Sequence, residues 1–164
     1  MEATDSGKLK IHDLRSKPEY IPFLARISYE YWQKPDPLWS IEEWSGWYEA
    51  ALENSNDSPP RCWVADIADQ IVGSVSLVLD GEIAEKSNIS PWLDGLIIDE
   101  SFRGKGFGRI LHNFAITQAS QLGFNEIYLW TEAQSIWYSK LGWNIFEVSR
   151  FRHIPITIMS REIS

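Results

Sequence analysis

Apolar residues along the chain follow two spacings, and these predict alternating strands and helices. Short apolar runs between turn residues indicate strands, whereas apolar residues three or four positions apart indicate helices. The predicted strands are 8–13, 62–67, 70–79, 92–98, 126–130, 143–151 and 154–161, and the predicted helices are 18–32, 40–54, 107–122 and 133–141. This order indicates an α/β fold, with a mixed central sheet of about seven strands flanked by about four helices.

Turn and cap residues support several of these boundaries. Pro18 is well placed to open the first helix, and Pro35 and Pro37 end it. Ser40 is suited to cap the second helix, because Glu43 three residues later completes a capping box. No linker, internal repeat or low-complexity tract divides the 164 residues, so we expect a single domain.

Composition narrows the class of protein. The only cysteine, Cys62, excludes an intrachain disulfide and is expected to be a small buried thiol in a reducing compartment. Met1 to Lys10 lack the apolar segment of a signal peptide, and no run approaches the ~18 apolar residues of a membrane span. A net charge of −8 opposes general adhesion to nucleic acid or anionic lipid. We therefore expect a cytoplasmic protein that binds neither nucleic acid nor membranes.

Between a predicted strand and a predicted helix, the chain reads Arg103-Gly-Lys-Gly-Phe-Gly108. Glycine lacks Cβ, so the backbone can adopt positive φ and bring several N–H groups close to an anion. The first amides of the following helix have no partner within that helix, and its dipole favours negative charge at this end. The stretch therefore predicts a phosphate-binding loop.

Two common phosphate loops do not fit this spacing. The dinucleotide pattern requires glycines at relative positions one, three and six, but the third falls on Arg109. The triphosphate loop requires Ser or Thr after Gly-Lys, but Gly106 follows Lys105. A nucleotide-binding domain stays open as an alternative, which strong binding of ATP would favour.

The remaining pattern resembles the pyrophosphate loop of the GNAT acetyltransferase superfamily, Arg/Gln-x-x-Gly-x-Gly, which Arg103, Gly106 and Gly108 match. Leu96-Ile97-Ile98 before the loop and Tyr138-Ser-Lys-Leu-Gly-Trp143 after it are similar to the family's strand and second motif. The resemblance implies the GNAT acyl-CoA N-acyltransferase fold for residues 1–164, with about 9–163 as the fold proper.

The resemblance also implies how acetyl-CoA binds. In the family the cofactor lies in a V-shaped opening between the fourth and fifth strands, and its pantetheine arm pairs with the fourth strand as an added strand would. The matching positions here are Leu96, Ile97 and Ile98, which by their side chains alone would be ordinary strand core. An N–H group near Ile98 is suited to hold the thioester oxygen as it gains negative charge. The phosphates are expected at Arg103, Gly104, Lys105, Gly106, Phe107 and Gly108.

The chain departs from the family pattern at three positions. Thr131 replaces the asparagine that often follows the fifth strand, and we expect its hydroxyl to bond the cofactor arm instead. Gln134 stands where alanine is common. Glu100 replaces a common proline, which affects the rigidity of the loop but not its amides.

Tyr138 matches the family's general acid, beside the cofactor. A thiolate leaving group has a usual pKa of about 8.5 and tyrosine one near 10, so this proton transfer runs uphill by roughly 2 kcal/mol. The catalytic gain is then expected at the modest end of the ~10²–10⁴ range for general acids. Without the loop, Tyr138 would be interpreted as a ring that packs beside Trp137.

The general base is less defined by sequence. Asp94 precedes Leu96 and Ile98 by even steps, which places it on their side of the strand, and Glu132 follows the fifth strand. Either carboxylate is a candidate to deprotonate an amine through water, and either also has an ordinary interpretation as a solvated side chain. The three histidines lack partners at ligand spacing, so no metal site is predicted.

The acceptor side is expected in residues 28–57, which hold seven acids against one base, together with seven aromatic residues. Carboxylates beside aromatic faces suit a cationic amine. However, Trp44, Trp47, Tyr48 and Ala51 recur at helical spacing, which indicates core packing instead. A cationic acceptor therefore stays an open alternative.

Taken with the resemblance, the sequence predicts an N-acetyltransferase that moves acetyl from acetyl-CoA to a primary amine of a small molecule or peptide by direct attack. A CoA-binding regulatory or sensor domain without turnover is the alternative from another class. The acceptor, the acyl-chain preference and the oligomeric state, for which a homodimer is one option, are not specified by the sequence.

Overall fold

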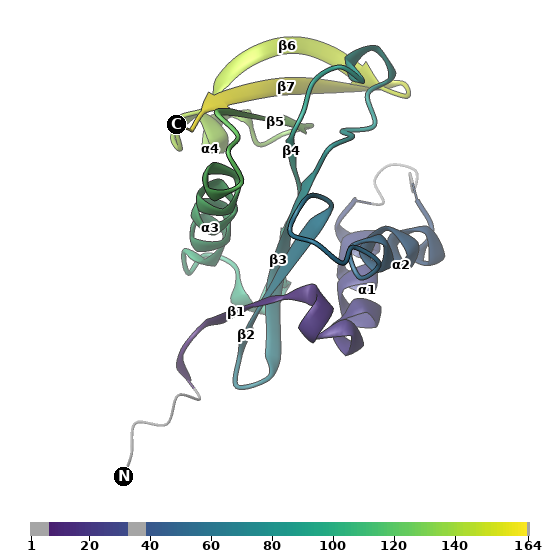
Figure 1. Ribbon diagram of the computed structural model, residues 1–164, viewed down its shortest axis with the longest axis vertical. Helices are drawn as coiled ribbons and strands as arrows, with labels where there is room; N and C mark the ends of the chain where they lie inside the picture. The colour runs from purple at the N-terminus through teal and green to yellow at the C-terminus, as the bar shows by residue number, and fades with distance from the viewer. Residues whose placement is uncertain (1–6, 33–38, 164) are drawn as a thin grey trace. The chain divides into compact units, whose positions relative to one another are not determined.

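The computed structural model of the protein describes residues 7–32 and 39–163 (Figure 1). Seven strands form one mixed sheet in the order β1-β2-β3-β4-β5-β7-β6, with four α-helices, which confirms the predicted α/β class. The strands are β1 Lys10–Asp13, β2 Arg61–Ile67, β3 Gln70–Val78, β4 Trp92–Ile98, β5 Glu126–Thr131, β6 Asn144–Phe151 and β7 Ile154–Glu162. The helices are α1 Ile21–Trp32, α2 Ile41–Ala50, α3 Phe107–Gln121 and α4 Ser135–Ser139.

The chain forms two compact units. The first holds Met1–Ser76 and Gly95–Phe114, and the second holds Leu77–Asp94 and Ala115–Ser164. The strands β3 and β4 and the helix α3 each pass from one unit into the other along the chain. The single domain expected from the sequence stays a prediction, and the two units are described separately below.

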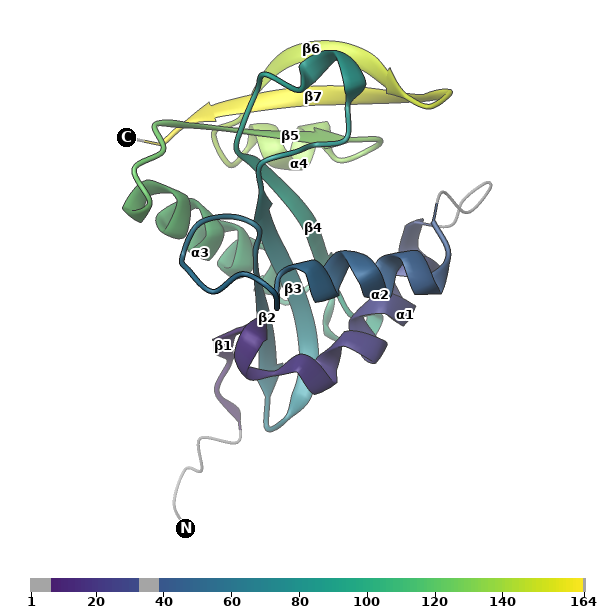
Figure 2. The ribbon, with the colours of Figure 1, turned by 45° about the vertical axis from the view of Figure 1, so that its right-hand side comes forward.

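In the first unit, α1 and α2 lie side by side next to β2 and β3 (Figure 2). Their apolar faces bury Leu24, Tyr48 and Ala51, and the Tyr48 hydroxyl lies 2.7 Å from Ser28 Oγ inside this core. Phe114 of α3 contacts the ring of Trp63 on β2, with ring centroids 5.6 Å apart. The residues of α2 at helical spacing therefore pack in this core, which confirms the packing role predicted for them.

The caps explain where α1 and α2 begin. Ser40 accepts the N–H of Glu43, and Glu43 accepts the N–H of Ser40, so the predicted capping box is confirmed. The first helix was expected from Pro18, but Pro18–Tyr20 form a separate 3-10 turn and α1 starts at Ile21.

The second helix was expected to reach residue 54 but ends at Ala50. Its last bonds tighten to the three-residue spacing, from Ala51 N–H to Tyr48 O and from Leu52 N–H to Glu49 O. Asn54 then uses its side chain to hold the following turn, where it donates to the carbonyls of Ser58 and Pro60.

In the second unit, β7 lies between β5 and β6 and is antiparallel to both, as the top of Figure 1 shows. The ring of Trp130 on β5 stacks on Phe151 of β6, with centroids 4.9 Å apart. The fourth helix was expected over residues 133–141 but covers Ser135–Ser139, because Thr131 Oγ1 accepts the N–H of Gln134 and holds that residue in a turn.

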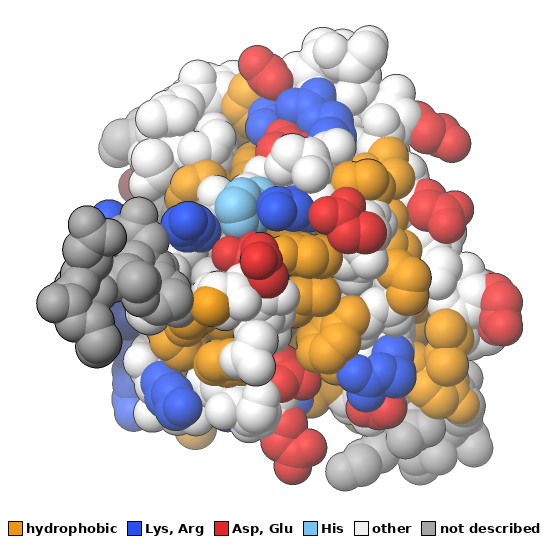
Figure 3. Space-filling model, turned by 90° about the horizontal axis from the view of Figure 1, so that it is seen from below, with side chains coloured by type: hydrophobic (Ala, Val, Ile, Leu, Met, Phe, Trp, Pro, Cys, Tyr) orange, Lys and Arg blue, Asp and Glu red, His pale blue; other side chains and the backbone are white. Residues whose placement is uncertain are grey.

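The surface and the helices add two observations. On the face seen in Figure 3, acidic and basic side chains are interspersed among apolar ones rather than gathered by sign. Among the residues that the structure describes, no helix has the length and apolar character needed to cross a bilayer.

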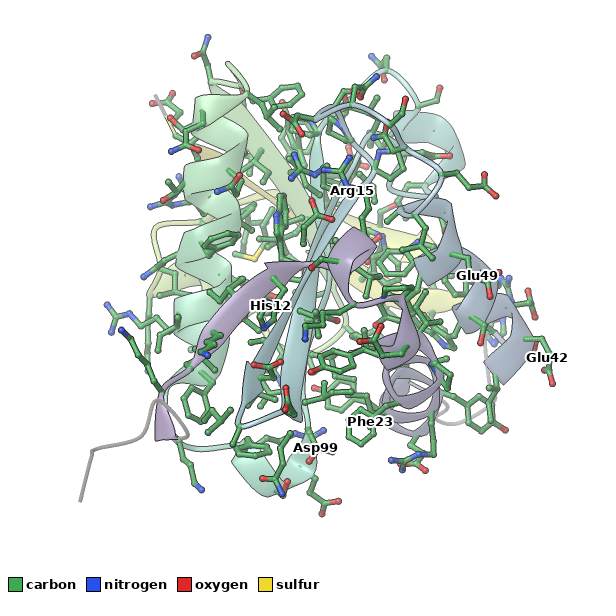
Figure 4. All side chains as sticks on the ribbon, turned by 60° about the horizontal axis from the view of Figure 1, so that its bottom comes forward. His12, Arg15, Phe23, Glu42, Glu49 and Asp99 are labelled. Atoms are coloured by element: carbon green, nitrogen blue, oxygen red, sulfur yellow. The ribbon has the colours of Figure 1, made fainter. Side chains whose placement is uncertain are left out.

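A buried polar network ties β1 and β2 to the turn before α1. Asp66 is 2% exposed, and its Oδ2 accepts the Tyr20 hydroxyl at 2.7 Å and lies 3.1 Å from His12 Nε2. Figure 4 shows His12 on β1 at the centre of this face. Burial alone would raise the pKa of Asp66, but the hydrogen bonds from Tyr20 and His12 outweigh it and hold the pKa below its usual range.

We predict that Tyr20→Phe destabilises the fold at pH 7 by about 2 kcal/mol, because it removes a hydrogen bond to a buried carboxylate. A depressed folded-state pKa contributes stability that is present above the unfolded pKa and is lost as pH falls. The difference in unfolding free energy between variant and wild type should therefore become smaller below about pH 4. Urea unfolding at a series of pH values measures it.

The control for this measurement is Tyr29→Phe. Tyr29 lies on α1 and is partly buried, and its hydroxyl makes no hydrogen bond within residues 7–32 and 39–163. We expect a change within about 0.5 kcal/mol. Two results would contradict the role given to Asp66. One is equal destabilisation by Tyr20→Phe and Tyr29→Phe, and the other is a loss of unfolding free energy in Tyr20→Phe that does not vary with pH.

Candidate functional site

The fourth strand has a left-handed residue at its centre. Gly95 has φ +59, a conformation that costs an L-residue with a Cβ of the order of 1–2 kcal/mol. A Cβ at this position would also lie 2.6 Å from Cη2 of Trp47, so the α2 indole occupies the space where a side chain would be. Both observations require glycine here, and they fix the course of β4 where it enters the first unit.

After Gly95, the strand carries the predicted cofactor positions. Leu96 and Ile98 are half-buried, whereas Ile97 is 3% exposed and belongs to the core. The N–H of Asp99 donates to the carbonyl of Val72 at 2.8 Å, which anchors the end of β4 to β3. The V-shaped opening expected between β4 and β5 stays a prediction.

A short 3-10 turn, Glu100–Phe102, connects the strand to the loop. Asp99, labelled in Figure 4, caps this turn by accepting the N–H of Ser101 at 3.3 Å. Across the loop, the rings of Phe102 and Phe107 meet edge to face with centroids 6.1 Å apart. The cap and the ring pair hold the base of the loop, although Glu100 stands where the family often has proline.

The loop itself forms an open cradle. Gly104 and Gly106 have φ +76 and +86, and no heavy atom lies within 4 Å of a Cβ built on either. The N–H of Ile110 donates to the carbonyl of Gly106 at 3.3 Å, which starts α3 and leaves the amides of residues 107–109 without helical partners. Free amides, two left-handed glycines and a helix N-terminus are suited to bind an anion such as a phosphate.

Two cations flank this cradle. Arg103 donates from Nε to the carbonyl of Ile98 at 2.9 Å, and its Cζ lies 5.0 Å from the ring centroid of Tyr31. Lys105 Nζ lies 5.7 Å from the ring centroid of Phe102. Both side chains are exposed, so their charge is available to an anion bound by the backbone.

Tyr138 lies in the second unit, on α4. Its half-buried ring meets the rings of Trp137 and Trp143 edge to face, with centroids 4.9 and 6.0 Å away. The carbonyl of Tyr138 accepts the N–H groups of Leu141 and Trp143, which fixes the short helix at its end. These contacts hold the ring in one place, as either a packing role or a catalytic role requires.

The other predicted positions in the second unit differ in surroundings. Thr131 is 9% exposed and its Oγ1 accepts the Gln134 N–H, so its hydroxyl proton and one lone pair are left for further bonds. Glu132 is exposed. Asp94 is half-buried at the end of the β4 segment in this unit, directly before Gly95.

Sequence reasoning missed Glu82, which lies near Asp94. The segment after β3 is pinned at Gly81, whose carbonyl accepts Trp130 Nε1–H at 2.8 Å. Glu82 follows with φ +67, and its N–H donates to Asp80 at 2.8 Å. Burial, together with the negative charges of Asp94 and Asp80 and against the opposing charge of Arg152, raises the pKa of Glu82 to about 7.

No pattern in the sequence singles out Glu82, because the segment 80–90 is polar and was interpreted as a loop. The only local signal is Asp-Gly-Glu, which is ordinary turn composition. Its partner Asp94 is twelve positions later, and only the return of β4 beside β3 brings the two carboxylates together.

A hollow of about 650 Å³ also lies in the second unit, lined by Glu85, Lys86, Glu147, Val148, Ser149, Arg150, Arg152 and Pro155. Lys86 and Glu147 form an ion pair of 2.8 Å within it. It contains none of the residues predicted from the sequence. Within the described parts of the chain, no three His, Cys, Asp or Glu side chains are grouped as metal ligands.

The structure therefore places the predicted residues in two sets. The loop from Arg103 to Gly108 and the strand residues Leu96, Ile97 and Ile98 are continuous within the first unit. Asp94, Thr131 and Tyr138 lie in the second unit, where Glu82 joins Asp94. The roles of both sets stay predictions.

Solved structures with the same fold are numerous. An aminoglycoside 6'-N-acetyltransferase complexed with coenzyme A is 18% identical, with TM-score 0.74 over 94% of this chain and 97% of that one. The yncA protein from Salmonella typhimurium, with its cofactor acetyl-CoA, is 16% identical, with TM-score 0.70 over 95% and 94%. A spermidine/spermine N-acetyltransferase from Vibrio cholerae is 21% identical, with TM-score 0.65 over 94% and 92%. At these identities the likeness shows the fold.

The sequence pattern of the acetyltransferase (GNAT) family matches residues 21–143, which run from the start of α1 past Tyr138 and include the glycine cradle. No curated protein sequence matches the chain. Because the family match covers most of the chain and the fold agrees with it, the chain belongs to the GNAT family of acetyltransferases, which depend on acetyl-CoA.

Proposed function

We propose that this acetyltransferase moves the acetyl group to a primary amine by direct attack, without a covalent enzyme intermediate. The open glycine cradle at the start of α3 is the observation that carries the proposal, because its amides and flanking cations suit a pyrophosphate. Cys62, the only thiol, is 2% exposed, and burial raises its pKa to about 12, so it is a poor candidate for an acyl carrier.

Acetyl-CoA supplies an activated acetyl thioester when it is bound. We assign its phosphates to the backbone of residues 103–108 and its amide-containing arm to the backbone of Leu96, Ile97 and Ile98. An N–H group near Ile98 is then suited to stabilise negative charge on the acetyl oxygen. In the second unit, Thr131 offers its hydroxyl proton, and Tyr138 is the proton donor for the leaving thiolate.

The proton of the amine needs an acceptor. A lysine-like amine with a pKa near 10.4 is neutral in only about one molecule in 2,500 at pH 7, whereas an α-amino group near pKa 8 is neutral in about one in ten. We assign this role to Asp94 and Glu82 acting as a pair. With its pKa near 7, Glu82 both accepts and releases a proton at neutral pH, which a carboxylate of ordinary pKa does less well.

The acceptor is proposed to be a small-molecule or peptide amine. Two structural neighbours are named for aminoglycoside and spermidine/spermine acetylation, and both of these acceptor classes carry several amino groups. In this chain, the acids of α2 that Figure 4 labels, Glu42 and Glu49, project away from the aromatic core. The combination of carboxylate and aromatic face expected for a cationic acceptor is therefore not formed by these two residues, and a neutral α-amine is an equal candidate.

Titration calorimetry with acetyl-CoA, CoA and ATP, followed by thiol release with polyamines, aminoglycosides, amino acids and peptides, tests the proposal. Micromolar binding of acetyl-CoA with amine-dependent thiol release is the expected result. Binding without release by any amine would favour a sensor role, and binding of ATP alone would favour a nucleotide-binding domain.

We predict that Gly106→Trp abolishes CoA binding and leaves the protein folded, because the indole fills the cradle. The matched control is Gly123→Trp, since Gly123 has a similar φ of +92 and equally open surroundings but lies after α3. Both variants carry the same backbone strain, of the order of 1–2 kcal/mol. Calorimetry beside thermal unfolding separates the two effects, and unchanged CoA affinity in Gly106→Trp would remove the assignment of the loop.

We predict that Tyr138→Phe lowers kcat by about 10² at nearly constant affinity for acetyl-CoA, because the general acid is lost while the ring contacts stay. Steady-state thiol release measures kcat, and calorimetry measures affinity. Tyr128→Phe, in the same unit, should leave kcat near the wild-type value. If Tyr138→Phe also leaves kcat near the wild-type value, Tyr138 is a packing residue.

We predict that Glu82→Gln removes the acidic limb of the pH profile of kcat/KM, which in the wild type should rise through pH 7 as Glu82 ionises. A raised folded-state pKa contributes stability at low pH that is lost as pH rises, so the same variant should be more stable than wild type above pH 7. Glu85→Gln, exposed in the same segment, is the control for both. An unchanged limb in Glu82→Gln would exclude Glu82 as proton acceptor.

A further inference from the structure

The guanidinium of Arg103 is held on two sides and open on the third. Its Nε donates to the carbonyl of Ile98 at 2.9 Å, and its Cζ lies 5.0 Å from the ring centroid of Tyr31. Within the described residues, its two terminal nitrogens make no hydrogen bond. The side chain is exposed and belongs to the same loop as the glycine cradle.

Contacts with other aromatic rings fix the position of the Tyr31 ring beside this cation, and these contacts continue from Tyr31 into the core of the first unit. It lies in the last turn of α1 and is 41% exposed. Its ring meets Trp32 edge to face at 5.0 Å, and Trp32 stacks on Trp44 at 5.2 Å with the two planes 21° apart. Trp44 is 9% exposed and packs in the core of the first unit.

We infer that Tyr31 is a positioning residue for the cofactor, which orients the free edge of Arg103 toward the phosphates of CoA. This inference rests on the proposed cofactor site. An arginine fork binds phosphate through two parallel hydrogen bonds, and the long side chain otherwise loses rotamer freedom on binding. The Ile98 carbonyl and the Tyr31 ring restrict that freedom before the ligand arrives, so less entropy is lost at the moment of binding.

Tyr31 also lies far from Arg103 in the sequence, on α1 at the start of the segment 28–57 expected on the acceptor side. The contact is therefore a link between α1 and the loop, and both belong to the first unit. Its effect should be confined to ligands that carry the pyrophosphate. Acetylpantetheine, which has the thioester and the amide arm but no phosphates at this position, should bind without sensing Tyr31.

The test is a double-mutant cycle on CoA binding with Tyr31→Leu and Arg103→Met. An exposed cation–π contact is worth enough to change affinity about two- to fivefold, so Tyr31→Leu should weaken CoA binding by that factor. Tyr31→Phe keeps the ring and should bind CoA as wild type does. Because Tyr31 acts through Arg103, Tyr31→Leu should add nothing in the Arg103→Met background.

Three results would overturn the inference. The first is an unchanged CoA affinity in Tyr31→Leu. The second is that Tyr31→Leu weakens CoA binding as much in the Arg103→Met background as it does in wild type. The third is that Tyr31→Leu changes the KM for acetylpantetheine by the same factor as the affinity for CoA. Thermal unfolding of each variant shows whether a loss reflects the fold. NMR exchange of the Arg103 Nε–H adds a readout without ligand, since Tyr31→Leu should speed this exchange and Tyr31→Phe should not.

The outcomes separate this inference from the proposed function. If wild type does not bind CoA and Gly106→Trp does not change CoA affinity, the assignment of the cofactor site is wrong, and so is the role inferred for Tyr31. If wild type binds CoA, Gly106→Trp abolishes binding and the cycle is additive, the cofactor site stands and only the role of Tyr31 is wrong.

Discussion

The contact between Gly95 and Trp47 is the constraint on which the candidate site depends. One left-handed φ in the middle of β4 changes the course of the strand, and the indole from α2 occupies the space left by the missing side chain. Asp94 lies on one side of this residue in the chain, and the positions assigned to the cofactor arm lie on the other. A side chain at Gly95 would displace either the backbone of β4 or the indole of Trp47.

The same strand explains why the loop is well defined. After β4, a bond to β3 holds Asp99, the turn at Glu100–Phe102 is capped, and Arg103 returns to bond the end of the strand. Apart from the bond from Asp99 to Val72 on β3, these contacts are local, within about five residues, so the loop gets its shape mostly from its own sequence. That is why a pattern of glycines and one arginine was enough to predict a phosphate site here.

Local signals were also sufficient for β4, which the structure gives the predicted bounds of Trp92–Ile98, and for the Ser40 capping box. Helix ends were predicted less well. Pro18 opens a 3-10 turn rather than α1, and the bond from Gln134 to Thr131 delays α4, because side-chain bonds to the backbone compete with the helical ones. Glu82 and Tyr31 could not be predicted at all, since each depends on a partner that only the tertiary fold brings near.

The loop is expected to recognise its ligand mainly through backbone amides and two cationic side chains. Glu82 titrates near neutrality. Cofactor affinity and proton transfer would then respond to different properties of the solution. Ionic strength would screen the loop and weaken binding, whereas acidification would slow the chemistry and leave the bound fraction of cofactor unchanged. A cell could thus lower turnover by a shift in pH without releasing CoA into its free pool.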